Sequence, residues 1–411
     1  MQLESKDKLI KTKKAPTELS DTNQEDLKED VLEKRKLDVL SGAVIGENVF
    51  FQKTLQTTVN EGLDDMVSQA RRYKENPLSS RTGYVAEADH CATFNTRKAL
   101  ERDKTRAVRQ PNGNHGDYKI VKGDKVVVEG EVKYYGSAEK TENSMRKYDD
   151  QQLVGPSDQI KEIKEIARKK AAKGNASSND TRQQTAREHE AVEKNVSDSI
   201  TDCETKSTPR TRKEAKKITR KATKGKVAPE DVMPPLGESV GTAMKSGGLS
   251  GAKMGMGFTA VVSGVSNINA WVKDEKNGQE ALFDAAKDIA TGTIDGGVKG
   301  AVASGATVLA IHAATMTTST VAKTVLRSNA PVVAAITAFD VAKDVFNFAN
   351  GNIDGAEFCK KTTRNCAVAG AGWAGAETGA VFGSFLGPIG TVAGGVVGGM
   401  IGCFLAGSWF D

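Results

Sequence analysis

The sequence feature that most constrains the fold is a glycine at every fourth position near the C-terminus. On an α-helix this spacing places all members of a series along one stripe. A stripe without side chains lets a second helix backbone approach closely, which is how helices associate in lipid. The sequence therefore predicts two glycine-zipper helices hinged at Pro388, with packing positions Gly375, Gly379, Gly383 and Gly387 before the proline and Gly390, Gly394, Gly398 and Gly402 after it.

The same region lacks charge. Between Val381 and Phe410, 30 consecutive residues include no charged side chain, which exceeds the roughly 20 apolar residues that span a bilayer. We expect the glycine zipper to associate with a membrane or with itself. The alternative is a soluble Gly/Ala-rich helical hairpin packed on its own domain, because Gly and Thr make the run only mildly hydrophobic and Gly disfavours helices in water.

Charge divides the chain into two unlike halves. Residues 1–235 contain 46 Lys and Arg against 40 Asp and Glu, whereas residues 236–411 contain 12 and 13. This difference indicates a soluble region tethered to a membrane-competent one. The first residues lack the apolar segment of a secretory signal peptide. The five cysteines form no CxxC pair, so neither a zinc site nor a disulfide framework is expected, and reduced thiols fit a cytoplasm.

The predicted fold class is α+β with several domains. Residues 1–40 are highly charged and are expected to form a flexible arm, with one amphipathic helix around Glu25–Leu40. Residues 41–170 have the mixed composition and strand signals of a small α/β domain. Residues 171–235 are polar and are expected to be a basic linker with intermittent helix. Residues 236–411 are expected to be an all-α domain of Gly/Ala-rich helical hairpins.

An internal repeat supports the hairpin interpretation of the second half. FDAAKDI at 283–289 recurs as FDVAKDV at 339–345, and GTIDG at 292–296 recurs as GNIDG at 351–355. We expect the two IDG segments to be short turns between helices. A weaker glycine series, Gly247, Gly251 and Gly255, opens this half.

The end of the expected linker is strongly basic. Between Lys206 and Lys226 there are ten basic residues and one acid, Glu214. Such a segment can bind nucleic-acid phosphates through counterion release or anionic lipid headgroups beside a membrane segment, and a solvated, self-repelling linker is the alternative. The candidate binding residues are Arg210, Arg212, Lys213, Lys216, Lys217, Arg220 and Lys221.

The segment 115–136, HGDYKIVKGDKVVVEGEVKYYG, has the pattern of a β-hairpin, because two β-branched runs flank a Gly-Asp turn. A three-residue loop, Gly123–Lys125, would place Asp117 opposite Glu131 and on the same face as Lys133. A four-residue loop would place Asp117 on the other face. The first register brings two carboxylates and a lysine together, a set that can hold Mg²⁺ and activate water for attack on a phosphate.

This pattern, D-x13-E-x-K, resembles the PD-(D/E)xK family of nucleases, whose restriction-endonuclease-like core has such a hairpin after a helix that carries a further acid. Glu87, in the helix expected near Arg81–Ala92, matches that acid. The later run with Tyr148, Gln152 and Gln159 also resembles restriction-like domains of bacterial toxin and phage-associated proteins, which tend to carry glycine-zipper tails. The sequence departs from the pattern at Gly116, where the family has proline.

The resemblance implies a Mg²⁺- or Mn²⁺-dependent nuclease that hydrolyses DNA or RNA without a small-molecule cofactor. Glu87, Asp117 and Glu131 would be the metal ligands, and Lys133 and Gln159 would assist catalysis. It also implies a membrane-associated toxin or phage-defence effector in the bacterial cytoplasm. The alternative is a non-enzymatic membrane-active or scaffolding protein whose zipper helices oligomerise or insert in a bilayer.

The histidines offer weaker candidates for chemistry. His90 follows Glu87 by three residues and could act as a general base or metal ligand. Neither His90 nor His115 has a second histidine at ligand spacing, so both are expected to be structural or exposed. His312 lies in an apolar run, where a core histidine is expected.

Overall fold

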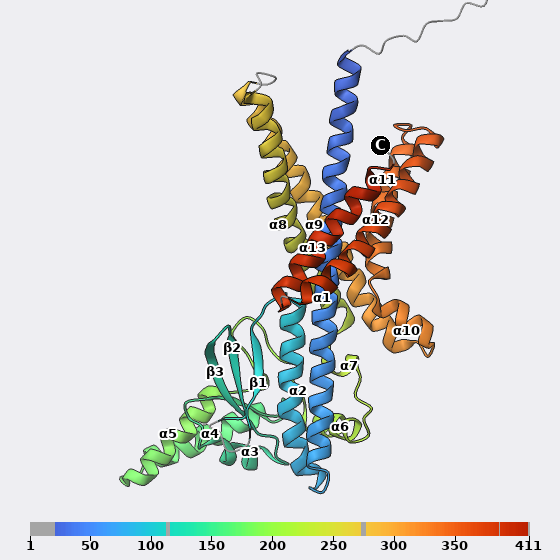
Figure 1. The fold of residues 1–411 in the computed structure, drawn as a ribbon. Coiled ribbons are helices and arrows are strands. Elements are labelled where there is room, and N and C mark those ends of the chain that lie inside the picture. Colours follow the sequence, from blue (N-terminus) through green and yellow to red (C-terminus); the bar gives the residue numbers. More distant parts are fainter. Residues whose placement is uncertain (1–20, 112–115, 273–276, 386, 410–411) are drawn as a thin grey trace, which may run out of the picture.

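The computed structural model describes residues 21–111, 116–272, 277–385 and 387–409 (Figure 1). It has the expected mixed α+β class, with one five-stranded sheet in a mainly helical chain. The elements in the first half are α1 (Asp21–Arg72), α2 (Leu78–Leu100), β1 (Arg106–Arg109), β2 (Tyr118–Lys122), β3 (Lys125–Val132), α3 (Ala138–Met145), β4 (Gln152–Val154), α4 (Ile160–Asn175), α5 (Asp180–Asn195), β5 (Val196–Ser197), α6 (Arg212–Thr223) and α7 (Pro229–Val232). Those in the second half are α8 (Leu236–Val272), α9 (Gly278–Met316), α10 (Thr320–Arg327), α11 (Ala330–Ala349), α12 (Gly355–Ser384) and α13 (Gly387–Gly407).

The sheet has the order β1-β2-β3-β4-β5. The first three strands form an antiparallel meander, and β4 and β5 continue it in parallel. The parallel pairs need crossover connections, which α3 supplies between β3 and β4, and α4 with α5 supply between β4 and β5. Helices therefore connect the parallel strands of the sheet.

Each face of the sheet packs on a different set of helices. On one face, Phe94 of α2 shares a core cluster with Tyr118, Ile120 and Val132 of the strands. Tyr118 and Ile120 alternate with more exposed neighbours along β2, as a strand with one buried face requires. On the other face, residues of β4 and β5 pack on α3, α4 and α5, and this cluster contains Met145, Leu153, Ile163, Val192 and Val196.

The structure differs from the expected linker over residues 171–235. Within this range β5 completes the sheet, and Ile200 and Ala215 belong to the same core cluster as Phe94. Helix α6 is highly charged, but its apolar residues recur at helical spacing. Ala215, Ile218 and Ala222 are consequently buried on one stripe. The high charge of this segment suggested a linker, but a narrow apolar stripe of α6 packs into the core.

In the second half, α8 and α9 form a hairpin held together by glycines. Added Cβ atoms at Gly247, Gly251 and Gly255 would collide with the backbone of α9 at Gly300, Gly296 and Gly292 respectively. Gly292–Gly296, the expected turn, is instead the interior of α9, because its glycines form this helix contact. The related segment at 351–355 does form a turn, between α11 and α12, where Gly351 has φ +71°.

The predicted C-terminal zipper is present. Gly375, Gly379 and Gly383 of α12 face Gly398, Gly394 and Gly390 of α13, so the two series pack on each other. Helix α12 ends at Ser384 and α13 begins at Gly387, so Pro388 lies in the first turn of α13, where a missing N–H group costs nothing. Gly402, the last member of the series, packs on the backbone of α12 at Ala371. Gly387 is the first residue of α13.

Helix α1 connects the two halves. Its 52 residues extend about 78 Å at the α-helical rise, and Figure 1 shows it running from beside α2 into the helices of the second half. There Gly42 and Gly46 face Gly399 and Gly395 of α13, where a Cβ at either α1 position would collide with the partner backbone. The helix expected at Glu25–Leu40 is therefore part of a longer one, and residues 1–20 of the expected arm lie outside the described residues.

One helix among the described residues is both long and apolar enough to cross a membrane. It is the stretch Gln279–Met316 of α9, and 61% of its most apolar window is buried inside the protein. The tail from Val381, which the sequence favoured, contains only a shorter apolar stretch, Ala393–Gly407. Helical length and composition alone do not distinguish a membrane helix from a buried core helix.

Candidate functional site

The β2–β3 hairpin has the predicted final register, but it reaches that register by another route. The turn contains two residues, Gly123 and Asp124, so that Lys122 pairs with Lys125 rather than with Val126. A bulge then shifts the pairing between Ile120 and Val121. Beyond it Tyr118 pairs with Gly130, as the three-residue loop would also give, and Asp117 lies just before β2 with its N–H group bonded to Gly130. The three-residue loop was wrong, and the bulge supplies its missing residue.

Asp117 is held in place by the backbone on both sides. Its N–H group donates to the carbonyl of Gly130 at 2.8 Å, and its carboxylate Oδ2 accepts from the N–H of Val132 at 2.9 Å. The preceding Gly116 has φ +90°, a conformation that residues with a Cβ rarely adopt. At the position where the resembled family has proline, this chain turns into the strand through a glycine.

Lys133 lies between two carboxylates. Its ammonium group donates to Glu131 and lies 3.4 Å from Asp117 Oδ2. The same Nζ atom is 5.1 Å from the ring centroid of Tyr148, a cation–π distance. Glu131 is almost fully buried, whereas the side chains of Asp117 and Lys133 keep about a fifth of their surface exposed, at 21% and 18%. The group is therefore partly exposed to solvent.

Glu87 reaches the same place from α2. The predicted helix forms, and Glu87 is buried on its sheet-facing side. Burial is the main cause that raises the pKa of Glu87, to about 8, and the charge of Asp117 raises it further, while Lys133 and Arg109 oppose the shift. A carboxyl group with this pKa is mostly protonated at neutral pH. The structure thus brings together Glu87, Asp117, Glu131 and Lys133.

An ion pair that the sequence reasoning missed borders this group. Arg109 of β1 binds Asp65 of α1 through two contacts of 3.0 and 3.1 Å, and Gln69 donates to the same carboxylate at 3.1 Å. Arg109 is close enough to lower the pKa of Glu87. No local motif marks Asp65, because it meets the hairpin only through the packing of α1.

Gln159 is adjacent to the group rather than within it. Its Oε1 atom accepts from Thr141 at 2.8 Å, and its Nε2 atom donates to the carbonyl of Tyr135 at 3.2 Å. It immediately precedes α4. Gln159 therefore fixes the backbone two residues beyond Lys133, a supporting position that differs from the predicted contact with water or phosphate.

The donor set suits a hard divalent cation in charge and type. With Glu87 mostly protonated, the carboxylates of Asp117 and Glu131 face one ammonium group, and Arg109 is already paired, so the group keeps a net negative charge. The oxygens are not convergent, since Lys133 bridges Asp117 and Glu131. Among the described residues, the one acidic trio whose oxygens lie within 4.8 Å of one another is Asp103, Asp202 and Glu204. That trio surrounds the Lys98 ammonium group, which lies 2.8 Å from Asp202 and already supplies the compensating charge.

His90 is structural, as its lack of a histidine partner suggested. Its ring nitrogens lie 2.8 Å from Ser207 Oγ and 2.9 Å from the Tyr134 hydroxyl. Complete burial lowers its pKa to about 3. Burial also raises the pKa of the neighbouring Cys91 thiol, so this thiol is not an activated nucleophile. His115 lies outside the described residues, and His312 is partly buried in α9.

The basic residues expected to bind nucleic acid or lipid divide into two groups. Arg210 forms a two-contact ion pair with buried Asp89, Arg212 is buried with Nη2 donating to the Ser79 carbonyl, and Lys221 pairs with Asp231. These three stabilise the fold. The others lie at exposed or half-exposed positions of α6, namely Lys213, Lys216, Lys217 and Arg220.

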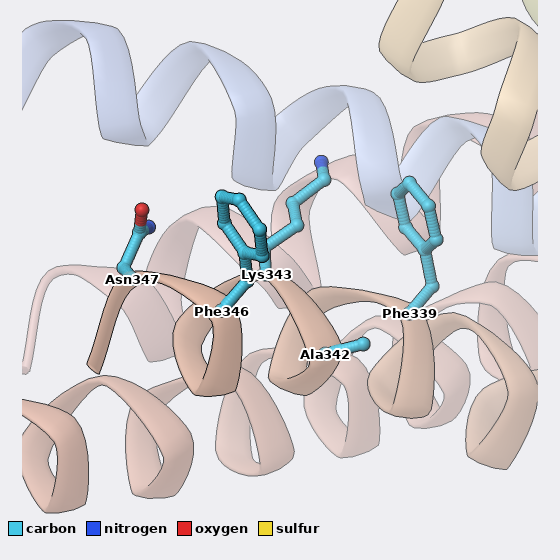
Figure 2. A pocket seen from close by; sticks show the side chains of 5 residues that line it. All are labelled: Phe339, Ala342, Lys343, Phe346 and Asn347. Atoms are coloured by element: carbon cyan, nitrogen blue, oxygen red, sulfur yellow. The ribbon is translucent and has the colours of Figure 1, made fainter. Parts of the chain in front are cut away.

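A surface hollow of about 410 Å³ lies on α11 in the second half. Figure 2 shows Phe339, Lys343 and Phe346 projecting from α11 towards a neighbouring helix. Lys343 lies over the Phe339 ring and is paired with Asp295 and Asp340. The hollow is open and mostly apolar, and the charge of Lys343 is already neutralised by its acidic partners. It therefore offers fewer groups for catalysis or ligand binding than the hairpin group does.

Comparison of the chain with protein-family models, curated proteins and solved structures finds no match. The functional interpretation therefore depends on the geometry of these side chains.

Proposed function

We propose that the sheet domain is a metal-dependent nuclease that hydrolyses phosphodiester bonds of DNA or RNA. The observation that supports this most directly is the contact of Lys133 with both Asp117 and Glu131, on a hairpin whose register needs a bulge to form it. A solvated cross-strand charge ladder would not require a buried third acid. Here Glu87 supplies one from a separate helix.

Glu87, Asp117 and Glu131 would hold Mg²⁺ or Mn²⁺. When bound, the ion would polarise the phosphate and lower the pKa of a water molecule. The Val132 N–H group orients the Asp117 carboxylate, and α2 fixes Glu87 at the base of the group. Lys133 would turn from the carboxylates to the phosphate, where its ammonium group can stabilise developing negative charge.

The direct test is cleavage of plasmid DNA and of RNA by the full-length protein in Mg²⁺, Mn²⁺ or EDTA. We expect metal-dependent cleavage that is lost in Asp117→Asn and Lys133→Met. Asp124→Asn is the matched control, because Asp124 is an exposed acid in the turn of the same hairpin. If folded protein cleaves neither substrate, or if the Asp117 and Asp124 variants behave alike, the proposed catalytic group is refuted.

The exposed basic face of α6 would add sequence-independent affinity for nucleic acid. Lys213, Lys217 and Arg220 are exposed and recur three or four residues apart, so they lie on one side of the helix. Ala215 and Ile218 anchor the opposite side in the core. Phosphate binding by such a face weakens as salt is raised.

We also propose that the second half associates with a membrane, and this supports the non-enzymatic alternative if the nuclease test fails. The observation is an inverted distribution of polarity. Buried ion pairs lie between helices, such as Asp38 with Arg364 and Lys299 with Asp340. Large apolar side chains are exposed on the outside, including Leu282, Phe283, Ile294, Phe346, Phe382, Ile401 and Leu405. Glycine contacts combined with this distribution are typical of helices packed in lipid.

Vesicle flotation tests the membrane proposal. Full-length protein is mixed with vesicles of neutral lipid or of neutral lipid containing anionic lipid, and we expect it to float with both. Substituting Phe382→Asp, an exposed site on α12, should weaken flotation, whereas Asp354→Asn, at the polar turn before α12, should not. Protein that stays in the soluble fraction with both vesicle types would favour the buried-hairpin alternative.

A further inference from the structure

The distribution of tyrosine in the fold points to the kind of substrate that the nuclease site takes. The chain has six tyrosines. Tyr118 and Tyr134 are buried in the core of the sheet domain. The other four, Tyr73, Tyr84, Tyr135 and Tyr148, are only partly buried or exposed, and we call them the tyrosine cluster.

Contacts place these rings beside the candidate site. Tyr148 lies 5.1 Å from the Lys133 ammonium group. Tyr135 follows Lys133 by two residues and is 45% exposed. Tyr84 precedes Glu87 by three residues on α2, so the two lie on the same side of that helix. The three tyrosines come from different parts of the chain and lie next to residues of the group.

The rings also lie close to one another. Tyr73 and Tyr84 stack with centroids 3.7 Å apart and an interplanar angle of 12°, and the guanidinium group of Arg72 lies 5.5 Å from the Tyr73 centroid. The pKa of Tyr84 is raised by burial, and also by Tyr73, Glu87, Tyr135 and Asp117. Tyr148 has a raised pKa with burial, Asp117 and Tyr135 as causes. The electrostatics therefore agree that these rings and the carboxylates share one region.

We propose that the tyrosine cluster binds unpaired nucleotides beside the scissile phosphate, so that the substrate is single-stranded nucleic acid or the single-stranded end of a duplex. This inference rests on the proposed nuclease function. Aromatic rings bind bases by stacking, and every base has a face for this. In a duplex those faces are covered by neighbouring base pairs. Rings beside the carboxylates therefore favour a strand whose bases are unpaired.

Fluorescence anisotropy in EDTA tests the inference separately from cleavage. The full-length protein is titrated into labelled single-stranded DNA, single-stranded RNA and blunt duplex DNA of equal length. We expect tighter binding to the single strands. Tyr84→Leu and Tyr135→Leu should each weaken single-strand binding by about 5- to 150-fold, the range expected for loss of base stacking. Tyr84→Phe and Tyr135→Phe keep the ring and should bind as the wild type does.

Two results would overturn the inference. One is a loss in the leucine variants that is equal for single strands and duplex. The other is a loss of the same size in the leucine and phenylalanine variants, which would indicate a structural or hydroxyl-mediated role. The Tyr135 pair guards against misfolding, because Tyr135 is not part of the Tyr73–Tyr84 stack. Metal-dependent cleavage of duplex without any effect of the tyrosines would refute this inference and leave the nuclease proposal standing. Single-strand binding that depends on the rings, without cleavage of any substrate, would support this inference and refute the nuclease proposal.

Discussion

The α12–α13 contact predicts opposite effects for the same substitution at two positions of one helix. A Cβ added at Gly379 would lie closer than 3.0 Å to the carbonyl group of Gly394 and 3.1 Å from the Cα atom of Gly398. A Cβ added at Gly370, also in α12, would meet nothing within 4 Å. Gly379→Ala should therefore force the helices apart, whereas Gly370→Ala should not.

The magnitude follows from subtracting one variant from the other. Alanine in place of glycine within a helix is favourable by about 1 kcal/mol, and both variants gain this term. Gly379→Ala alone meets backbone that cannot rotate away, and overpacking of this kind costs about 1–3 kcal/mol. We expect Gly370→Ala to raise the free energy of unfolding by about 1 kcal/mol above that of the wild type. The free energy of unfolding of Gly379→Ala should lie about 1–3 kcal/mol below that of Gly370→Ala.

Denaturant unfolding followed by the fluorescence of Trp373 measures this difference locally. Trp373 lies in α12 between the two positions and packs against the core cluster of α1 and α9. The other tryptophans, Trp271 and Trp409, are replaced by phenylalanine in all proteins compared. Equal unfolding free energies for the two alanine variants would refute the close helix contact and, with it, the zipper arrangement of α12 and α13.

Three further predictions concern the sheet domain. Gly116→Ala should lower cleavage activity by about 100-fold, because φ +90° positions the adjacent carboxylate and small misplacements have effects of this size, while the open site Gly136→Ala should leave activity unchanged in the same assay. The pKa of His90 falls from 6.5 to about 3 on folding, because the buried ring is held neutral. The free energy of unfolding is therefore highest above pH 6.5 and falls as the pH is lowered, by about 2 kcal/mol near pH 5. Unfolding curves of His90→Gln should lack this pH dependence. Arg210→Met should destabilise the domain by about 3–5 kcal/mol by leaving the buried Asp89 carboxylate unpaired, and a combined Arg210→Met, Asp89→Leu protein that is no more stable in thermal unfolding would contradict this cause.

The hairpin illustrates how far local sequence reasoning reaches. Alternating β-branched residues around Gly123 and Asp124 correctly predicted two antiparallel strands, and the pairing of Tyr118 with Gly130 agrees with the register that a three-residue loop gives. The turn length was wrong, because a two-residue turn and a bulge together give the same pairing as a three-residue loop. The sequence contains no signal that separates these routes, since both place the same residues opposite each other.

The second half shows a different limit. The IDG segments at 292–296 and 351–355 look alike in sequence, but the first is helical and the second is a turn. The first continues as a helix because Gly292 and Gly296 lie against the backbone of α8. Local propensity of glycine favours a turn at both places, so only the presence of a packing partner decides between them.

By itself the sequence determined the periodic features of this protein: the helical glycine stripes, the β-hairpin, and the helix that bears Glu87. These depend on residues within a few positions of one another, whose spacing fixes the face on which they lie. Only the tertiary structure decided the burial and raised pKa of Glu87, the approach of Asp65 on α1, and the contact of Gly42 and Gly46 with α13. These depend on which elements pack together, because burial and charge act through space and not along the chain.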